Sequence, residues 1–93
     1  MTSTSIKELG NTLYTEIYQF RPRGKYKGDK VSITYGRGQL FPWAISYRGN
    51  GHYFRTLPEA VAFAAGRRLI PEHMTEDMID RVNALMIMAG YEL

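Results

Sequence analysis

Basic side chains are concentrated in the middle of the chain, where they could bind phosphate groups. Between residues 21 and 55 there is a single acid, Asp29, against eight basic residues: Arg21, Arg23, Lys25, Lys27, Lys30, Arg37, Arg48 and Arg55. Aromatic residues are interleaved with them, namely Tyr26, Tyr35, Trp43, Tyr47 and Tyr53. Cations attract a polyanion, and exposed rings can stack on bases. The segment therefore predicts a nucleic-acid-binding surface.

Acidic residues gather at the other end of the chain. Residues 71–93 hold five acids and one basic residue, Arg81, whereas the formal net charge of the whole protein is only +3. Charge is thus sorted along the sequence, with a basic middle and an acidic tail. This sorting favours a partner that is a nucleic acid, or an acidic or nucleic-acid-binding surface of another protein.

The residue types that most enzymes need are scarce. The chain has no cysteine, which excludes a disulfide, a thiolate nucleophile and a Cys-ligated metal. The two histidines, His52 and His73, have no metal-ligand partner at a useful spacing. No phosphate-cradling Gly-Lys-Ser/Thr motif is present. We therefore expect a non-enzymatic protein with no catalytic residue, no metal site and no cofactor.

Length and composition bound the architecture. The chain has 93 residues, enough for one domain over residues 1–93. Apolar residues make up 44% of it and charged residues 23%, which is typical of a packed globular domain. No stretch approaches the ~20 apolar residues of a membrane span, and the N-terminus lacks the pattern of a signal peptide. We expect a cytoplasmic protein with no membrane partner.

Near the N-terminus the apolar residues have helical spacing. Positions 6, 9, 13, 17 and 20 are apolar, and Ser5 with Glu8 matches a capping box. This pattern predicts a helix over residues 5–20. Residues 13–20 are nevertheless rich in strand formers, and Gly10 could end a shorter helix before them. Whether residues 13–20 form a helix or a strand stays open.

The middle of the chain alternates between apolar and polar residues, as antiparallel strands do. Apolar side chains at positions 31, 33 and 35 predict one strand, and those at 43, 45 and 47 a second. Asn50-Gly51 is a strong hairpin signal, because both residues tolerate the positive φ of a type I′ turn. With these two residues as the loop, Tyr47 pairs with Phe54 on the apolar face of a third strand.

Two helices are expected after the strands. Thr56 and Glu59 match a second capping box and predict a helix over residues 57–68. Thr75 is the expected cap of a last helix that ends near residue 89. The expected fold is therefore α+β in the order α-β-β-β-α-α, with helices packed on one face of a three-stranded antiparallel sheet.

In element order this arrangement resembles the double-stranded-RNA-binding domain. The β-β-β-α part also resembles the sheet-reading DNA-binding domains at the N-termini of some phage integrases. The RNA-binding family usually begins its final helix with lysines that hold phosphates, where this chain has Leu57, Pro58, Glu59 and Ala60. The resemblance concerns topology alone, and we assign no family.

The sheet face away from the helices is the expected binding surface. Its residues are small, polar or basic: Lys30, Ser32, Thr34, Ala44, Ser46, Arg48, Tyr53 and Arg55. The loop that holds Arg21, Arg23, Lys25 and Lys27 has the spacing of a phosphate-contacting arm, and Arg37 lies in a turn at the sheet margin. Tyr53 is the candidate for stacking on a base, whereas Trp43, Tyr47, Phe54 and Phe63 are expected in the core. An ordinary solvated sheet face would show the same alternation.

The end of the chain is apolar around the whole circumference of the expected helix. Leu85, Met86 and Met88 therefore form a possible oligomer or partner surface, unless the N-terminal helix covers them. A homodimer through this helix is one expectation.

Two functions fit these observations. The first is a non-enzymatic nucleic-acid-binding domain that uses a basic sheet face and a basic loop. The alternative is a small inhibitor or adaptor, of the kind that phages and mobile elements encode, which binds an acidic or nucleic-acid-binding surface of a larger host complex. Charge alone does not separate them, because electrostatic attraction serves a protein partner as well as a nucleic acid.

Overall fold

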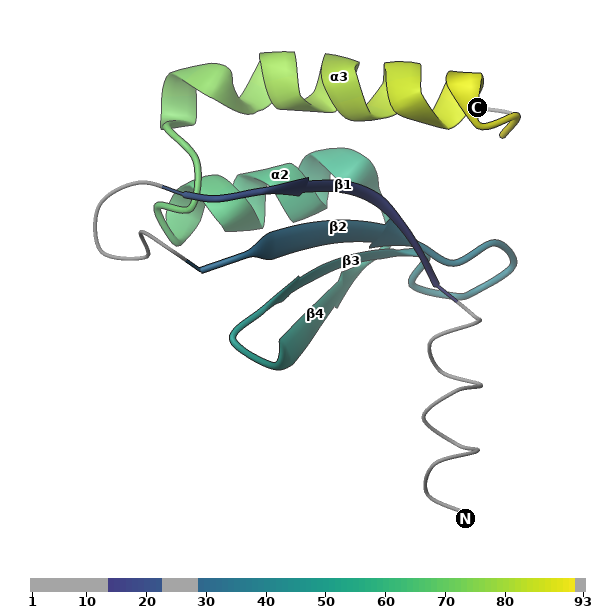
Figure 1. The fold of residues 1–93 in the computed structure, drawn as a ribbon, viewed down its shortest axis with the longest axis horizontal. Coiled ribbons are helices and arrows are strands. Elements are labelled where there is room, and N and C mark those ends of the chain that lie inside the picture. The colour runs from purple at the N-terminus through teal and green to yellow at the C-terminus, as the bar shows by residue number, and fades with distance from the viewer. Residues whose placement is uncertain (1–13, 23–28, 92–93) are drawn as a thin grey trace, which may run out of the picture.

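The computed structural model describes residues 14–22 and 29–91 of the chain (Figure 1). Four strands come first: β1 (Thr15–Phe20), β2 (Val31–Tyr35), β3 (Trp43–Tyr47) and β4 (Asn50–Phe54). The helix α2 (Leu57–Gly66), the short 3-10 helix η2 (Glu72–Met74) and the helix α3 (Thr75–Met88) follow. Residues 5–13 of the predicted helix over residues 5–20, and the predicted site residues Arg23, Lys25 and Lys27, lie outside the described residues.

The strands form one antiparallel sheet in the order β1-β2-β3-β4. The expected small α+β domain with an antiparallel sheet is confirmed, and the described residues contain two α-helices, α2 and α3. The expected number of three strands and the order α-β-β-β-α-α are wrong, because residues 15–20 form a strand that pairs with β2. With four strands before the helices, the described elements also do not follow the order of the double-stranded-RNA-binding domain.

A bulge in β1 explains why its residues look helical in the sequence. Glu16 pairs with Thr34 and Tyr18 pairs with Ile33, which leaves Ile17 unpaired between them. A bulge changes the alternation of the strand at that point. As a result Ile17, Tyr18 and Phe20 all pack against the hydrophobic core, and strict period-two alternation is lost.

The β3–β4 hairpin turns two residues earlier than the sequence indicates. Tyr47 pairs with Asn50 and Trp43 with Phe54, so the predicted pairing of Tyr47 with Phe54 is wrong. The loop residues are Arg48 and Gly49, whose φ values of 53° and 77° match the positive φ that a type I′ turn needs. A shift by two residues keeps every side chain on its expected face, so Trp43 and Phe54 still point toward the helices.

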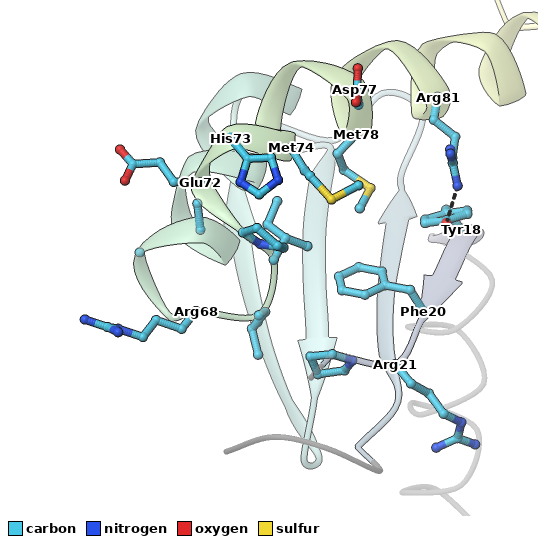
Figure 2. Close-up of a pocket in the computed structure, with 16 residues that line it drawn as sticks. Tyr18, Phe20, Arg21, Arg68, Glu72, His73, Met74, Asp77, Met78 and Arg81 are labelled. Atoms are coloured by element: carbon cyan, nitrogen blue, oxygen red, sulfur yellow. Dashed lines mark hydrogen bonds between the residues drawn. The ribbon is translucent and has the colours of Figure 1, made fainter. Parts of the chain in front are cut away.

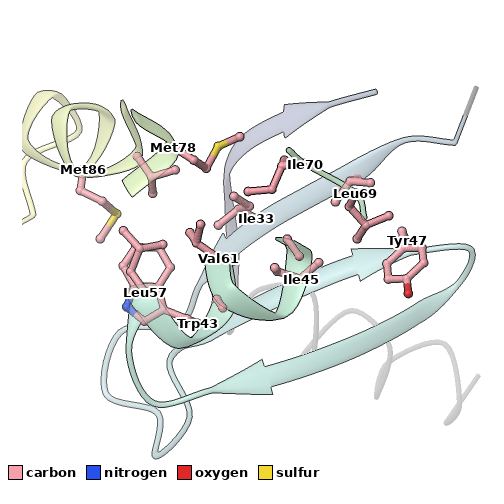
Figure 3. Close-up of a cluster of buried hydrophobic side chains, with 14 residues drawn as sticks. Ile33, Trp43, Ile45, Tyr47, Leu57, Val61, Leu69, Ile70, Met78 and Met86 are labelled. Carbon is pink, nitrogen blue, oxygen red and sulfur yellow. The ribbon is translucent and has the colours of Figure 1, made fainter. Parts of the chain in front are cut away.

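Both helices cover the same face of the sheet (Figure 1). α2 packs on β3 and β4, and α3 packs on β1 and α2. The core lies between these layers and includes Ile33, Ile45 and Val61, each at most 1% exposed (Figure 3). Of the four aromatic residues expected there, Trp43 and Tyr47 are buried, while Phe54 and Phe63 are partly buried at its margin.

The ends of the helices follow known capping geometries. At the start of α2, the Thr56 hydroxyl oxygen accepts a bond from the Glu59 amide at 3.3 Å, which confirms the predicted cap. α2 ends in a Schellman motif, in which the Leu69 amide donates to the Ala64 carbonyl at 2.9 Å. The helix is therefore shorter than the predicted span, and Arg68 takes the left-handed position of the motif with φ 61°.

α3 begins and ends close to the predicted residues. Met74 precedes it without a side-chain cap, so Thr75 is the first helical residue and not the expected cap. Gly90 closes α3 with φ 92°, in the same motif that Arg68 adopts after α2.

The apolar circumference of α3 is divided between core and solvent. Met86 is fully buried with Met78 and Val82, so it belongs to the core and not to the predicted partner surface. Leu85 is half-buried, and Met88 is 81% exposed. No helix within the described ranges is long and apolar enough to cross a membrane.

Candidate nucleic-acid interface

Three of the predicted site residues form a row at one end of the sheet. Phe20 pairs with Val31, so Arg21 and Lys30 are the next positions outward on β1 and β2. Ser32 pairs with Ser46, and the same register continued by two residues places Lys30 opposite Arg48. We call Arg21, Lys30 and Arg48 the basic row. All three are exposed, and adjacent strands lie about 4.8 Å apart, so the row presents closely spaced cations.

One acid lies beside the row. The Arg48 side chain donates through Nε to the Asp29 carboxylate at 2.7 Å, and both groups are accessible to solvent. The bond joins the β3–β4 turn to the residue before Lys30. It orients the Arg48 guanidinium at the end of the sheet and neutralises part of its charge.

Other predicted site residues lie at the opposite end of the sheet. Arg37 follows β2, and its Cζ is 4.8 Å from the centre of the Tyr91 ring. Arg55 follows β4, and its Cζ is 5.3 Å from the centre of the Phe41 ring. The structure therefore divides the predicted set between two ends of the sheet and does not gather it into one continuous basic face.

The middle of the outer sheet face is less open than expected. Ser32 is 8% exposed and Ala44 is 4% exposed, although both point away from the helices. The Ser32 hydroxyl donates to the Glu16 carboxylate at 2.7 Å. Glu16 lies on the edge strand β1 and is exposed on this face, so its carboxylate beside Ser32 is an acid that the sequence prediction did not place there.

An aromatic cluster lies on the outer face near the Arg55 end. The rings of Tyr14 and Tyr53 are 5.4 Å apart between centroids. The Tyr14 hydroxyl donates to the Phe41 carbonyl at 2.7 Å, and Arg55 lies over the Phe41 ring. We call Tyr14, Phe41, Tyr53 and Arg55 the aromatic patch. Tyr53 is 52% exposed and Phe41 is 40% exposed, so both rings are accessible to a ligand.

Gly51 makes room for the Tyr53 ring. A Cβ at position 51 would lie 3.1 Å from the Tyr53 hydroxyl oxygen and 3.4 Å from its Cζ. The ring therefore extends along β4 above Gly51. The absence of a side chain at position 51 lets Tyr53 lie close to the sheet surface.

Tyr14 has a distinct electrostatic environment. Burial, and secondarily the charge of Tyr53 when that ring is ionised, raise the pKa of Tyr14 above its ordinary value. Tyr14 therefore remains a neutral hydrogen-bond donor at physiological pH, which keeps its bond to the Phe41 carbonyl.

Sequence reasoning identified Tyr53 and Arg55 but missed their partners. The sequence pattern leaves Tyr14 in a segment that could be helix or strand, and it gives Phe41 no role. The only signal for Phe41 was a pair of large apolar residues, Leu40 and Phe41, in the loop between β2 and β3, where both are exposed.

A groove of about 1070 Å³ lies on the helix side, between the end of β1, the end of α2 and the start of α3. Figure 2 shows Phe20, Met74 and Met78 extending toward its middle, whereas Arg21 and Arg68 extend outward at its rim. At one wall Arg81 donates to the Tyr18 hydroxyl at 3.2 Å. Sequence reasoning did not predict this groove.

No group of three His, Asp or Glu side chains in residues 14–22 and 29–91 could hold a metal ion. Comparison of the chain with protein-family models, curated proteins and solved structures gave no match. A function for this chain can therefore be inferred only from the geometry of these surfaces.

Proposed function

We propose that the protein is a non-enzymatic nucleic-acid-binding domain whose basic row contacts phosphate groups. The observation that carries the proposal is that Arg21 follows β1, Lys30 precedes β2 and Arg48 follows β3, so that all three lie at the same end of the sheet. Cations on neighbouring strands are spaced closely enough to contact successive phosphates of one backbone. Arg23, Lys25 and Lys27 follow Arg21 in the sequence and precede Lys30, so they add positive charge to the same connection.

The proposal is tested by the salt dependence of binding. Neutralising three phosphates gives a slope of about −2.7 in log K against log salt for duplex DNA and about −2.1 for a single strand. Between 50 and 200 mM salt the affinity should therefore fall about 40-fold for a duplex and about 20-fold for a single strand. If Arg23, Lys25 and Lys27 also contact phosphates, both slopes should be steeper.

Arg21→Ala with Lys30→Ala should weaken binding and reduce the slope. The matched control, Arg67→Ala with Arg68→Gly, removes the same charge from the helix side of the molecule and should leave the slope unchanged. Gly is used at position 68 because φ there is 61°. Equal effects of the two double variants would assign binding to net charge and not to the basic row.

The groove favours a second candidate, the protein-binding inhibitor or adaptor. Its walls offer apolar side chains, including Met74, which is 38% exposed, and its rim carries Arg21 and Arg68. An acidic segment of a partner protein with an apolar anchor residue would complement this arrangement. A complex that survives nuclease treatment, is lost in Met74→Glu and is kept in Tyr53→Ala would favour this candidate.

A further inference from the structure

We propose that the ligand is a single-stranded nucleic acid whose bases stack on the aromatic patch. This inference rests on the proposed function, because it names the form of nucleic acid that the basic row would hold. It depends on a separate set of residues, Tyr14, Phe41, Tyr53 and Arg55, at the other end of the outer sheet face.

The accessibility of the rings favours unpaired bases. Tyr53 is 52% exposed although Tyr14 contacts it, and it extends along the sheet above Gly51. A base can stack on such a ring only through its own face. In a duplex the faces of the bases are covered by their neighbours, whereas in a single strand they are available.

The partners of Tyr53 and Phe41 hold both rings in place before a ligand binds. Tyr14 contacts the Tyr53 ring and also donates to the Phe41 carbonyl at 2.7 Å, so one side chain links the two platforms. Arg55 lies over Phe41 and can offer its guanidinium to a base or a phosphate. Fixed rings lose little conformational entropy when a base stacks on them.

The residues of the outer sheet face disfavour a duplex. A duplex that lay across the outer face would bring its phosphates close to the exposed carboxylate of Glu16. The small residues that would have to contact it offer little, because Ala44 is buried and the Ser32 hydroxyl already donates to Glu16. A single strand can follow β4, from Arg48 in the turn to Arg55, without crossing Glu16 on β1. The five residues of β4 span about 15 Å.

The experiment measures Kd at 50 and 200 mM salt for four fluorescent 15-nucleotide probes: single-stranded DNA, single-stranded RNA and the two corresponding duplexes. We expect single strands to bind at least about 10-fold more tightly than duplexes. Tyr53→Ala should raise the Kd for single strands by about 5- to 150-fold, the range for loss of one stacked base. Tyr53→Phe keeps the ring and should bind nearly as well as the wild type.

Arg55→Ala and Arg67→Ala form a matched pair of variants. Each Arg lies over a phenylalanine ring, Arg67 at 5.1 Å from the centre of Phe63, but Phe63 packs on the helix side of the sheet. Only Arg55→Ala should weaken single-strand binding. Measuring the melting temperature of every variant distinguishes a variant that has lost a contact with the nucleic acid from one that no longer folds.

The outcomes separate the two proposals. Equal or tighter duplex binding, unaffected by Tyr53→Ala, would overturn the stacking inference and leave the nucleic-acid proposal intact. Absence of salt-sensitive binding to all four probes would overturn both. Preference for single strands that Tyr53→Ala abolishes and Tyr53→Phe preserves would support the inference.

Discussion

Arg48 and Asp29, 19 residues apart in the sequence, are joined by a 2.7 Å bond that ties the β3–β4 turn to the start of β2. Arg48 is also the first turn residue and has a left-handed conformation, with φ 53°. The same contact supports the hairpin and sets the charge of the basic row, so structure and proposed function are coupled there.

Asp29→Asn should therefore strengthen nucleic-acid binding while it slightly weakens the fold. Removing the carboxylate charge removes repulsion of phosphates and the ion pair that neutralises part of the Arg48 charge. Because both side chains are solvent-accessible, the loss in the free energy of unfolding should be under about 1 kcal/mol. Asp80→Asn, an exposed position on α3, removes the same charge at a distance and serves as the control in both titration and urea unfolding. Equal gains in affinity for the two variants would contradict a local effect.

Gly51→Ala should disturb the aromatic patch without straining the backbone. Position 51 does not need positive φ, but the added Cβ would meet the Tyr53 hydroxyl at 3.1 Å, so the ring must shift. We expect weaker single-strand binding with little change in the melting temperature. Gly49→Ala is the opposite case, because its φ is 77° and nothing lies within 4 Å of the added atom. It should lower stability and leave the ring in place.

Arg68→Gly should stabilise the protein. Arg68 occupies the left-handed position after α2, where a residue with a Cβ costs about 1 kcal/mol and glycine does not. For a domain of this size, 1 kcal/mol corresponds to about 4–8 °C in Tm. Gly90→Ala at the equivalent position after α3 should shift Tm in the opposite direction, as differential scanning calorimetry would show.

The raised pKa of Tyr14 predicts that the folded state loses stability at high pH. Its pKa is raised in the folded state, whereas in the unfolded chain a tyrosine ionises near pH 10. Above about pH 10 the unfolded state therefore releases this proton first, and stability falls as pH rises through the folded pKa. The urea midpoints at pH 9 and pH 11 should therefore differ less in Tyr14→Phe than in the wild type. Identical pH dependence in the two proteins would refute the assignment.

Met86→Ala and Met88→Ala should differ strongly in how much they lower the free energy of unfolding. Met86 is fully buried, so its truncation leaves a cavity and should cost about 2–5 kcal/mol. Met88 is 81% exposed, and its truncation should change stability by less than about 0.5 kcal/mol. If Met88→Ala instead abolished a dimer seen by light scattering, the predicted homodimer surface would be located on this side of α3.

The sequence predicted the last three strands, both helices and the face to which most side chains point. For residues 13–20 it favoured a helix and left a strand open, because the bulge at Ile17 produces apolar spacings of three and four that imitate a helix. It also misplaced the hairpin turn by two residues. The pattern of hydrophobic alternation cannot reveal this error, because moving the turn by two residues leaves Trp43 and Phe54 on the same face of the sheet.

The candidate site was only partly predictable because its contacts are long-range. The basic residues were evident from composition, but their division between the two ends of the sheet follows from strand pairing. Tyr14 reaches Phe41 over 27 residues of sequence. No local pattern indicates such a contact, and the exposed pair Leu40 and Phe41 carries information only once the loop is placed beside Tyr14.

The sequential order of the four strands also has a kinetic consequence. Each strand pairs with its neighbour in the chain, so the sheet can form by successive closure of short loops, which is entropically easier than distant pairing. The docking of α3 on β1 requires a much longer loop, because the contact between Arg81 and Tyr18 joins residues that are 63 positions apart in the sequence. We expect the sheet and α2 to form first and α3 to dock late, so that substitutions at Val82 would chiefly accelerate unfolding and leave the folding rate nearly unchanged.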